Sequence, residues 1–130
     1  MNYKMNTMPN AHCYVSVNGN RISLWSYNKM IIELVDNYKE FTLTCTGVYS
    51  PSTARHINRF CKELDFGIDY YFCKDLSKTE TQSITIMRTS PYNPVRDLIN
   101  RYRYNGSPLN QAAYDKAVRE TQYKEMRRYE

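Results

Sequence analysis

Hydrophobic and polar residues alternate along the first part of the chain, as they do in half-buried β-strands. Apolar side chains take every second position of residues 12–17, the segment Asn18-Gly19-Asn20 follows, and residues 21–27 resume the apolar pattern. An Asn-Gly pair readily takes positive φ at both central positions of a two-residue turn. The pattern therefore predicts a β-hairpin with this pair in its turn.

A second pair of strands follows the hairpin. Residues 30–35 are a continuous apolar run broken only by Glu33, and residues 36–39 are typical of a turn. Threonine then alternates with apolar residues from 41 to 46. Because β-branched threonine suits the solvated face of a strand, the first half of the chain predicts four antiparallel strands.

The next segment has the signature of a helix start. Ser50 precedes Pro51, an arrangement typical of an N-cap with proline at the first helical position. A helix is therefore expected over residues 52–64, with Gly67 just past its end. Its apolar stripe consists of Ala54, Ile57, Phe60, Cys61 and Leu64.

The opposite face of this predicted helix is basic. Arg55, Arg59 and Lys62 all fall on it, and His56 falls on the flank between the two faces. One face is therefore expected to pack on the sheet, while the other presents positive charge to solvent.

The second half of the chain predicts two more strands and two more helices. Residues 68–75 and 82–88 are expected to be strands. Asn93 then caps a helix that Asn105-Gly106 ends, and Ser107-Pro108 repeats the capping arrangement before a last helix. The apolar stripe of the first of these helices consists of Val95, Leu98, Ile99 and Tyr102. The last helix has only small or scattered apolar residues, so it is expected to be solvated or completed by a partner.

These elements define an α+β domain in which an antiparallel β-sheet of about six strands, in the order ββββ-α-ββ-α-α, is covered by helices. Residues 1–11 are polar and rich in Met and Asn, so they are expected to be a flexible N-terminal tail. Residues 12–130 are expected to form a single α+β domain, since 130 residues leave no room for a second core.

Composition narrows the function classes. The chain carries 18 Lys and Arg against 13 Asp and Glu, a formal charge of +5, which argues against an acidic mimic of DNA. No apolar run reaches the length of a membrane span and the N-terminal segment has no apolar signal, so we expect neither membrane insertion nor export. Thirteen tyrosines must help to complete the core.

The cysteines form no Cys-x-x-Cys pair, so neither a zinc ribbon nor a thioredoxin-type motif is present. The expected interpretation is that they are small buried hydrophobic residues and that the protein has no cofactor. The alternative is a discontinuous zinc site. Its candidate ligands are Cys13, Cys45, Cys61, Cys73, His12 and His56.

No catalytic motif is present, so enzyme activity is not expected. A Cys-His nucleophile is not expected either, because Cys61 follows His56 by five positions and would not face it on a helix.

Basic residues give the more informative surface signal. The residues expected to bind a partner are Arg55, Arg59, Lys62, Arg101 and Arg103. Arg96, Arg101 and Arg103 form a second basic run, after the one on the first helix. Tyr102 and Tyr104 alternate with Arg101 and Arg103, and a tyrosine at such a position could stack on unpaired bases. Direct nucleic-acid contact and a merely solvated charged face both stay open as interpretations.

Two segments resemble a family of small uncharacterised proteins of tailed phages. They are Ser26-Tyr27-Asn28 and the helix-start string Tyr49-Ser50-Pro51-Ser52-Thr53-Ala54-Arg55-His56-Ile57-Asn58-Arg59-Phe60. Lys29 departs from the Thr that the family tends to have, and the resemblance covers residues 12–65. It implies a phage or prophage origin and a hairpin-plus-helix core, and it carries over no catalytic residue.

Small phage accessory proteins act chiefly by binding host machinery, and this association leads to the functional hypothesis. We expect a non-enzymatic phage protein in the cytoplasm of a bacterial host. It would inhibit a host nucleoprotein by protein–protein contact, and an anti-CRISPR inhibitor of a Cas effector is the leading form of the hypothesis. The alternative is a nucleic-acid-binding regulator of phage gene expression.

Overall fold

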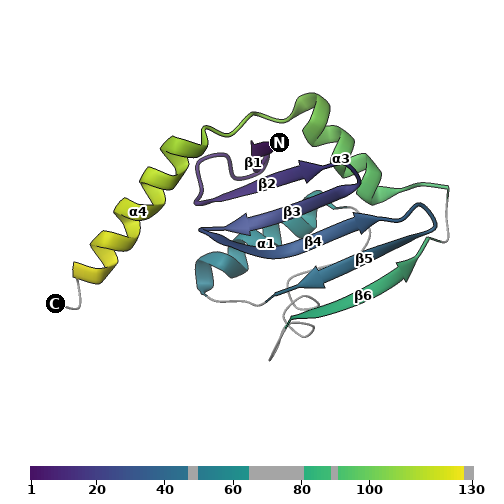
Figure 1. Cartoon of the computed structure of the whole chain (residues 1–130), viewed down its shortest axis with the longest axis horizontal. Coiled ribbons are helices and arrows are strands. Elements are labelled where there is room, and N and C mark those ends of the chain that lie inside the picture. Colours follow the sequence, from purple (N-terminus) through teal and green to yellow (C-terminus); the bar gives the residue numbers. More distant parts are fainter. Residues whose placement is uncertain (47–49, 65–80, 89–90, 128–130) are drawn as a thin grey trace.

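The computed structural model describes residues 1–46, 50–64, 81–88 and 91–127. These residues form a six-stranded antiparallel sheet whose spatial order follows the chain, together with three helices (Figure 1). The strands are β1 (Asn2–Lys4), β2 (Cys13–Asn18), β3 (Arg21–Ser26), β4 (Lys29–Asp36), β5 (Glu40–Cys45) and β6 (Gln82–Met87). The helices are α1 (Pro51–Glu63), α3 (Pro94–Asn105) and α4 (Gln111–Arg127).

The predicted α+β class is confirmed. The strand expected at residues 68–75 lies outside the described residues.

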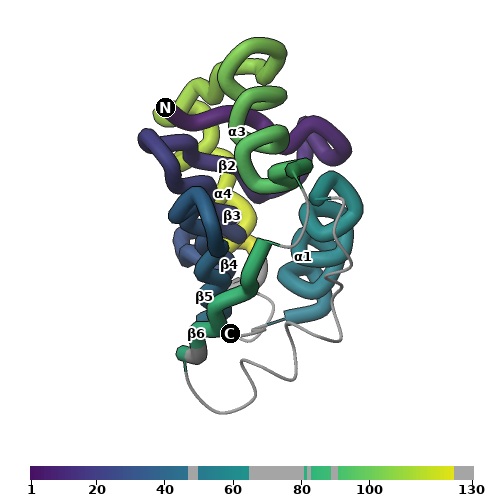
Figure 2. The backbone as a smooth tube through the Cα atoms, turned by 90° about the vertical axis from the view of Figure 1, so that its right-hand side faces the viewer, coloured from purple at the N-terminus to yellow at the C-terminus, as the bar shows by residue number. Residues whose placement is uncertain are grey.

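One face of the sheet carries the core. Alternate side chains of β2–β5 point to this face and are buried against apolar residues of α1 and α3. Seen edge-on, α1 lies on one side of the sheet (Figure 2). Strand alternation and helix periodicity thus meet in a single apolar layer, as the two hydrophobic patterns predict.

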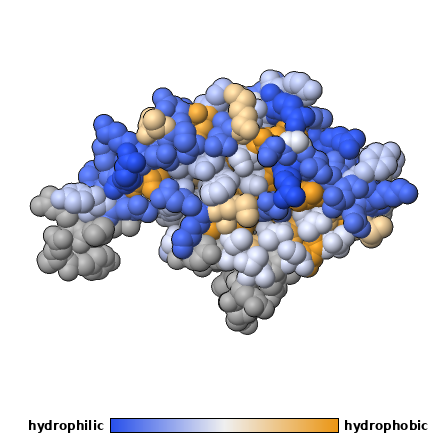
Figure 3. Space-filling model, in the orientation of Figure 1, coloured by the Kyte–Doolittle hydropathy of each residue, from blue (hydrophilic) through white to orange (hydrophobic). Residues whose placement is uncertain are grey.

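The other face of the sheet presents small hydroxyl side chains on β5 and β6. Thr42 and Thr44 are half-buried while Phe41, Leu43 and their neighbours on the core face are buried, which confirms the threonine pattern. Thr44 and Ser83 share a hydrogen bond of 2.7 Å across β5 and β6. In Figure 3 the middle of this face is pale, because serine and threonine are neither strongly polar nor apolar.

The expectation of a flexible N-terminal tail is wrong for its first residues. β1 pairs with β2, and the segment Ser107–Leu109 lies along the other edge of β1, where Tyr3 forms a bridge with Pro108. Tyr3 and Met5 are 5% and 0% exposed. A polar-looking segment is ordered because these two side chains complete the core.

The first hairpin has a different turn from the predicted one. Asn18 pairs with Arg21, so the two central residues are Gly19 and Asn20, and only Gly19 has positive φ (+60°). Glycine at the first central position with positive φ is typical of a type II′ turn. The hairpin is therefore confirmed, while the placement of an Asn-Gly pair at the two central positions is corrected.

Two of the three predicted helix starts are confirmed. Ser50 accepts a hydrogen bond from the Thr53 N–H at the start of α1, and Asn93 accepts one from the Arg96 N–H at the start of α3. The third prediction is wrong, because α4 begins at Gln111 and its first turn is capped by Asn110. Residues 107–109 are instead extended along β1.

α4 is attached to the sheet by a small separate cluster. Tyr114 and Val118 are buried against Tyr14, the Tyr114 ring meets Tyr14 edge-on, and the Tyr114 hydroxyl donates to the Tyr27 carbonyl. The rest of the helix extends beyond the sheet (Figure 1). The exposed side chains of Lys116 and Glu120 lie 4.0 Å apart on this helix. None of the helices in the described ranges is long and apolar enough to span a bilayer.

Candidate interaction surface

The basic face predicted for α1 is present. Arg55, Arg59 and Lys62 are exposed, on the side of the helix opposite Ile57 and Phe60, which are 1% and 0% exposed. Arg55 also donates to the Ser52 hydroxyl within the same helix. This face lies behind the sheet in the view of Figure 1.

Arg101 and Arg103 lie on different sides of α3. The Arg101 guanidinium contacts Asp97 at 3.0 Å and donates to the Glu63 carbonyl at 2.6 Å, so it holds α3 against the C-terminal end of α1. Arg103 instead donates to the Gly19 carbonyl at the β2–β3 turn. Contact of either arginine with a partner stays a prediction, but the structure does not bring the five predicted residues onto one surface.

The two tyrosines beside these arginines also differ. Tyr104 is 76% exposed, whereas Tyr102 is fully buried and donates a hydrogen bond of 2.7 Å to the Glu63 carboxyl group. The expectation that Tyr102 could stack on bases is therefore wrong. The other prediction for Tyr102, that it belongs to the apolar stripe of its helix, is confirmed. Its ring packs in the core, and its hydroxyl donates to the buried Glu63 carboxyl group.

A cluster that combines arginine and tyrosine lies at one end of the sheet. The guanidinium carbons of Arg88 and Arg96 lie 5.1 and 5.7 Å from the centre of the Tyr38 ring, within the range of cation–π attraction. Tyr38 stands in the β4–β5 turn with φ +73°, and it is 57% exposed. We call Tyr38, Arg88 and Arg96 the Tyr38 cluster.

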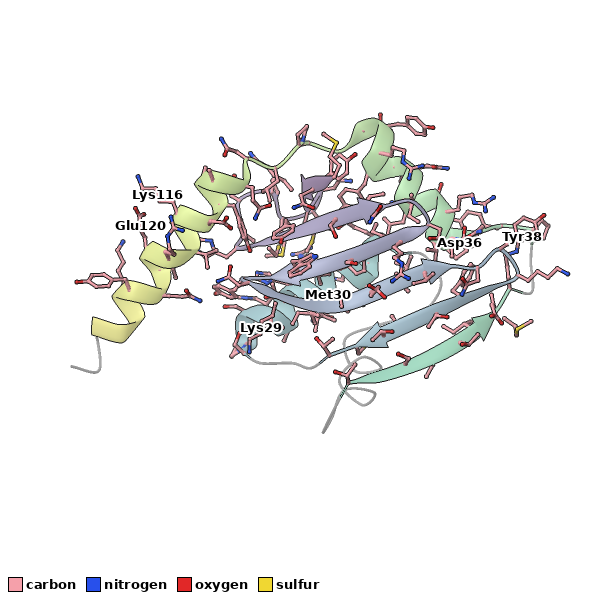
Figure 4. All side chains as sticks on the ribbon, viewed as in Figure 1. Lys29, Met30, Asp36, Tyr38, Lys116 and Glu120 are labelled. Carbon is pink, nitrogen blue, oxygen red and sulfur yellow. The ribbon has the colours of Figure 1, made fainter. Side chains whose placement is uncertain are left out.

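Asp36 fixes the position of the Tyr38 cluster. Its buried carboxylate accepts hydrogen bonds from the Tyr38 N–H at 2.9 Å, the Asn93 amide at 3.2 Å and Arg96 Nε at 3.2 Å. Asp36 and Tyr38 lie together at this end of the molecule, away from Lys29 and Met30 at the other end of β4 (Figure 4). A carboxylate that is only 3% exposed thus joins the β4–β5 turn to α3 and orients one arginine of the cluster.

Next to this cluster lies a cleft of about 220 Å³ between α3 and the β2–β3 turn. Its lining includes Arg96, Asn100 and Arg103 from α3, and Gly19 and Asn20 from the turn. The cleft therefore brings the predicted residue Arg103 together with Arg96.

The two segments that carry the phage-family resemblance meet inside the protein. Ser26 Oγ lies 2.8 Å from His56 Nδ1 and 3.3 Å from the Thr53 hydroxyl, which is 3.2 Å from Ser50. Ser26 and His56 are only 2% and 4% exposed. The motif residues therefore form an internal hydrogen-bond network that joins β3 to α1.

The environment of His56 keeps its imidazole neutral. Burial, then the nearby positive charge of Arg55 and the neighbouring His12, lower the pKa of His56 from 6.5 to about 4. His56 is expected only on the flank between the two faces of the helix, and this flank is buried because His56 contacts Ser26 of β3. A Ser-His pair this deeply buried can orient and stabilise the network, but a substrate would have to reach it through the core.

The cysteines give no support to the zinc alternative. Cys13, Cys45 and Cys61 are buried and form no disulfide with one another, and burial raises the pKa of the Cys13 thiol to about 12. Among the residues that the structure describes, no three His, Cys, Asp or Glu side chains come close enough to hold a metal ion, and Cys73 lies outside them.

Comparison with known proteins adds no assignment: no family model, curated protein or solved structure gives a significant match to the chain.

The sequence patterns missed the Tyr38 cluster and its anchor. Residues 36–39 carry only a turn signal, and nothing local relates them to Arg88 or Arg96, some fifty residues later in the chain. Their meeting depends on the pairing of β5 with β6 and on the packing of α3 against β4.

Proposed function

We propose that this protein is a non-enzymatic binding protein of phage or prophage origin. It would inhibit a host nucleoprotein by protein–protein contact, and a Cas effector is the first candidate target. The observation that carries the proposal is the Tyr38 cluster, an exposed tyrosine flanked by two arginines and held by a buried carboxylate. The phage origin rests on the sequence resemblance alone.

The composition and rigidity of this cluster favour binding. Tyrosine and arginine dominate the residues that contribute most to protein–protein affinity. A side chain that is already held in place loses less conformational freedom on binding, so more of its contact energy appears as affinity. Asp36 provides this preorganisation, because it accepts hydrogen bonds from the Tyr38 backbone N–H, which fixes the turn, and from Arg96 Nε, which orients a guanidinium beside the Tyr38 ring.

The burial of Ser26 and His56 also favours a binding function over a catalytic one. Ser26 and His56 are a hydrogen-bonded pair of nucleophile and base types, and both are almost fully buried. A general base must come within hydrogen-bond reach of a substrate proton. An internal role for this pair therefore supports a protein whose activity lies on its surface.

The test combines capture with an inhibition assay. The tagged protein is incubated with bacterial lysate, with and without nuclease, and is assayed against a panel of Cas effectors for loss of DNA interference. We expect capture of a nucleoprotein component that survives nuclease, and inhibition of at least one effector. Failure to capture any such protein, together with duplex-DNA binding that weakens steeply with salt, would instead support the regulator alternative.

A matched pair of tyrosine variants places the contact. Tyr38→Ala should weaken capture about tenfold or more, because hot-spot tyrosines contribute on the order of 2 kcal/mol. Tyr104→Ala removes another exposed tyrosine outside the cluster and should leave capture within about twofold. Equal losses for both variants would contradict the assignment of the Tyr38 cluster.

A further inference from the structure

The cleft between α3 and the β2–β3 turn has the features of a receptor for a single negatively charged group. Arg96, Asn100 and Arg103 are spaced four and three residues apart, so they share one face of α3. All three line the cleft, and Asn20 lines it from the turn. Every one of these side chains can donate hydrogen bonds.

Both guanidiniums are anchored through one nitrogen. Arg96 Nε donates to Asp36, and Arg103 Nη2 donates to the Gly19 carbonyl at 3.0 Å. A guanidinium has five N–H donors in a fixed planar arrangement, so each anchor orients the group while most of its donors stay available. Asn20 is anchored too, because its amide donates to the Asp36 carbonyl at 2.9 Å.

Charge and size select the ligand. The cleft contains two arginines and one carboxylate, Asp36, so one further negative charge would balance it. Its volume of about 220 Å³ is below the range of roughly 300–1,000 Å³ that is usual for drug-sized ligands. These values fit one side-chain carboxylate better than a run of phosphates, because a nucleic-acid backbone needs a longer track of positive charge.

We propose that this cleft receives one Asp or Glu carboxylate of an acidic protein partner. The inference rests on the proposed function, and it deepens that function by naming the chemistry that the partner must present. Arg103 and Arg96 would bind the carboxylate oxygens, Asn100 and Asn20 would donate to the remaining lone pairs, and the neighbouring Tyr38 cluster would contact the surface around it.

The experiment measures binding of a fluorescein-labelled peptide that alternates glutamate and serine, by fluorescence anisotropy at low salt. Arg103→Gln should weaken peptide binding about five- to tenfold, since a charge-assisted hydrogen bond is lost. Arg59→Gln removes the same charge from the exposed face of α1 and should change binding less than twofold. Arg103→Lys should restore only part of the affinity, because an ammonium lacks the planar set of donors.

Random duplex DNA of similar charge provides the competing arm. Equal losses for Arg103→Gln and Arg59→Gln would overturn the proposal, since they would indicate unspecific attraction. Tighter binding of DNA than of peptide, with the same dependence on Arg103, would also overturn it in favour of a phosphate site. Circular dichroism of each variant verifies the fold.

The outcomes for the cleft and for the proposed function can be told apart. Persistent capture and inhibition by Arg103→Gln, with unchanged peptide binding, would refute the cleft alone. Arg103-dependent peptide binding, with no host protein captured and no effector inhibited, would refute the proposed function and leave the carboxylate specificity of the cleft in place.

Discussion

At the scale of single residues, His56 should make the stability of the protein depend on pH. Its pKa is about 4 in the folded state, against about 6.5 in an unfolded chain. Below about pH 6.5 the His56 imidazole of the unfolded chain is therefore protonated, whereas in the folded protein it stays neutral until about pH 4. The free energy of unfolding should fall by about 1–3 kcal/mol over this interval and level off below it.

Urea unfolding between about pH 7.5 and about pH 4 measures this dependence. The variant His56→Asn keeps a hydrogen-bonding side chain next to Ser26 but does not titrate, so this part of the pH dependence should disappear. His12→Asn, at the half-exposed histidine that contacts Thr121, should retain it. An unchanged slope in His56→Asn would show that His56 is not the titrating group.

Glu63 gives a residue-scale prediction of opposite sign. Burial raises the pKa of its carboxyl group, although hydrogen bonds from Tyr102 and Thr7 and the charge of Arg101 act against the shift. A raised folded-state pKa means that stability is fully present below the unfolded value, near 4.5, and is lost as the pH rises through the folded value. Glu63→Gln keeps an acceptor for Tyr102 without the charge.

We therefore expect Glu63→Gln to be at least as stable as the natural protein at pH 7 and to lose this advantage near pH 4, where the carboxyl group is protonated. Glu63→Ala should instead lose about 1–3 kcal/mol, because the buried Tyr102 hydroxyl loses its acceptor. Denaturant titrations at both pH values measure the two differences. Marked destabilisation of Glu63→Gln at pH 7 would mean that the carboxylate charge itself stabilises the fold.

At the scale of elements, the N-terminal segment should contribute strongly to stability. Met5 is fully buried, so Met5→Ala should cost about 2–5 kcal/mol in the free energy of unfolding. The side chain of the adjacent Asn6 is exposed, and Asn6→Ala should cost no more than about 0.5 kcal/mol. Chemical denaturation of both variants measures the difference. Two equally small effects would restore the sequence-based expectation of a flexible tail.

The same segment shows which elements could be predicted from the sequence. The hairpins and the helices α1 and α3 carry periodic patterns and caps, so their existence follows from local physics. β1 has three residues, which is too short for a period to appear, and its order depends on contacts with β2 and the segment 107–109. Ser107-Pro108 has a helix-start signal, but this segment is extended because it pairs with β1. The helix therefore begins later, and Asn110 caps it.

At the scale of the whole molecule, charge that looks continuous in sequence is divided in space. The exposed arginines of α1 could be predicted because helical periodicity places them opposite the apolar stripe. The partners of Arg101 and Arg103 could not, since they belong to α1 and to the β2–β3 turn. Asp36 gave only a turn signal, although its carboxylate joins the β4–β5 turn to the start of α3.

This division allows a last prediction about which surface acts. The α1 face and the Tyr38 end lie on different sides of the molecule, so one compact partner site should depend on only one of them. Arg88→Glu combined with Arg103→Glu should reduce capture of the host protein by tenfold or more, on the order expected for contact residues. Arg55→Glu combined with Arg59→Glu changes the net charge equally, and its effect should be small and should vanish at physiological salt, because it acts only through long-range attraction. Capture measured at low and physiological salt separates the two. If the α1 variant loses binding at both salt concentrations while the other variant retains it, the acting surface is the basic face of α1, and the arginines at the Tyr38 end serve the fold alone.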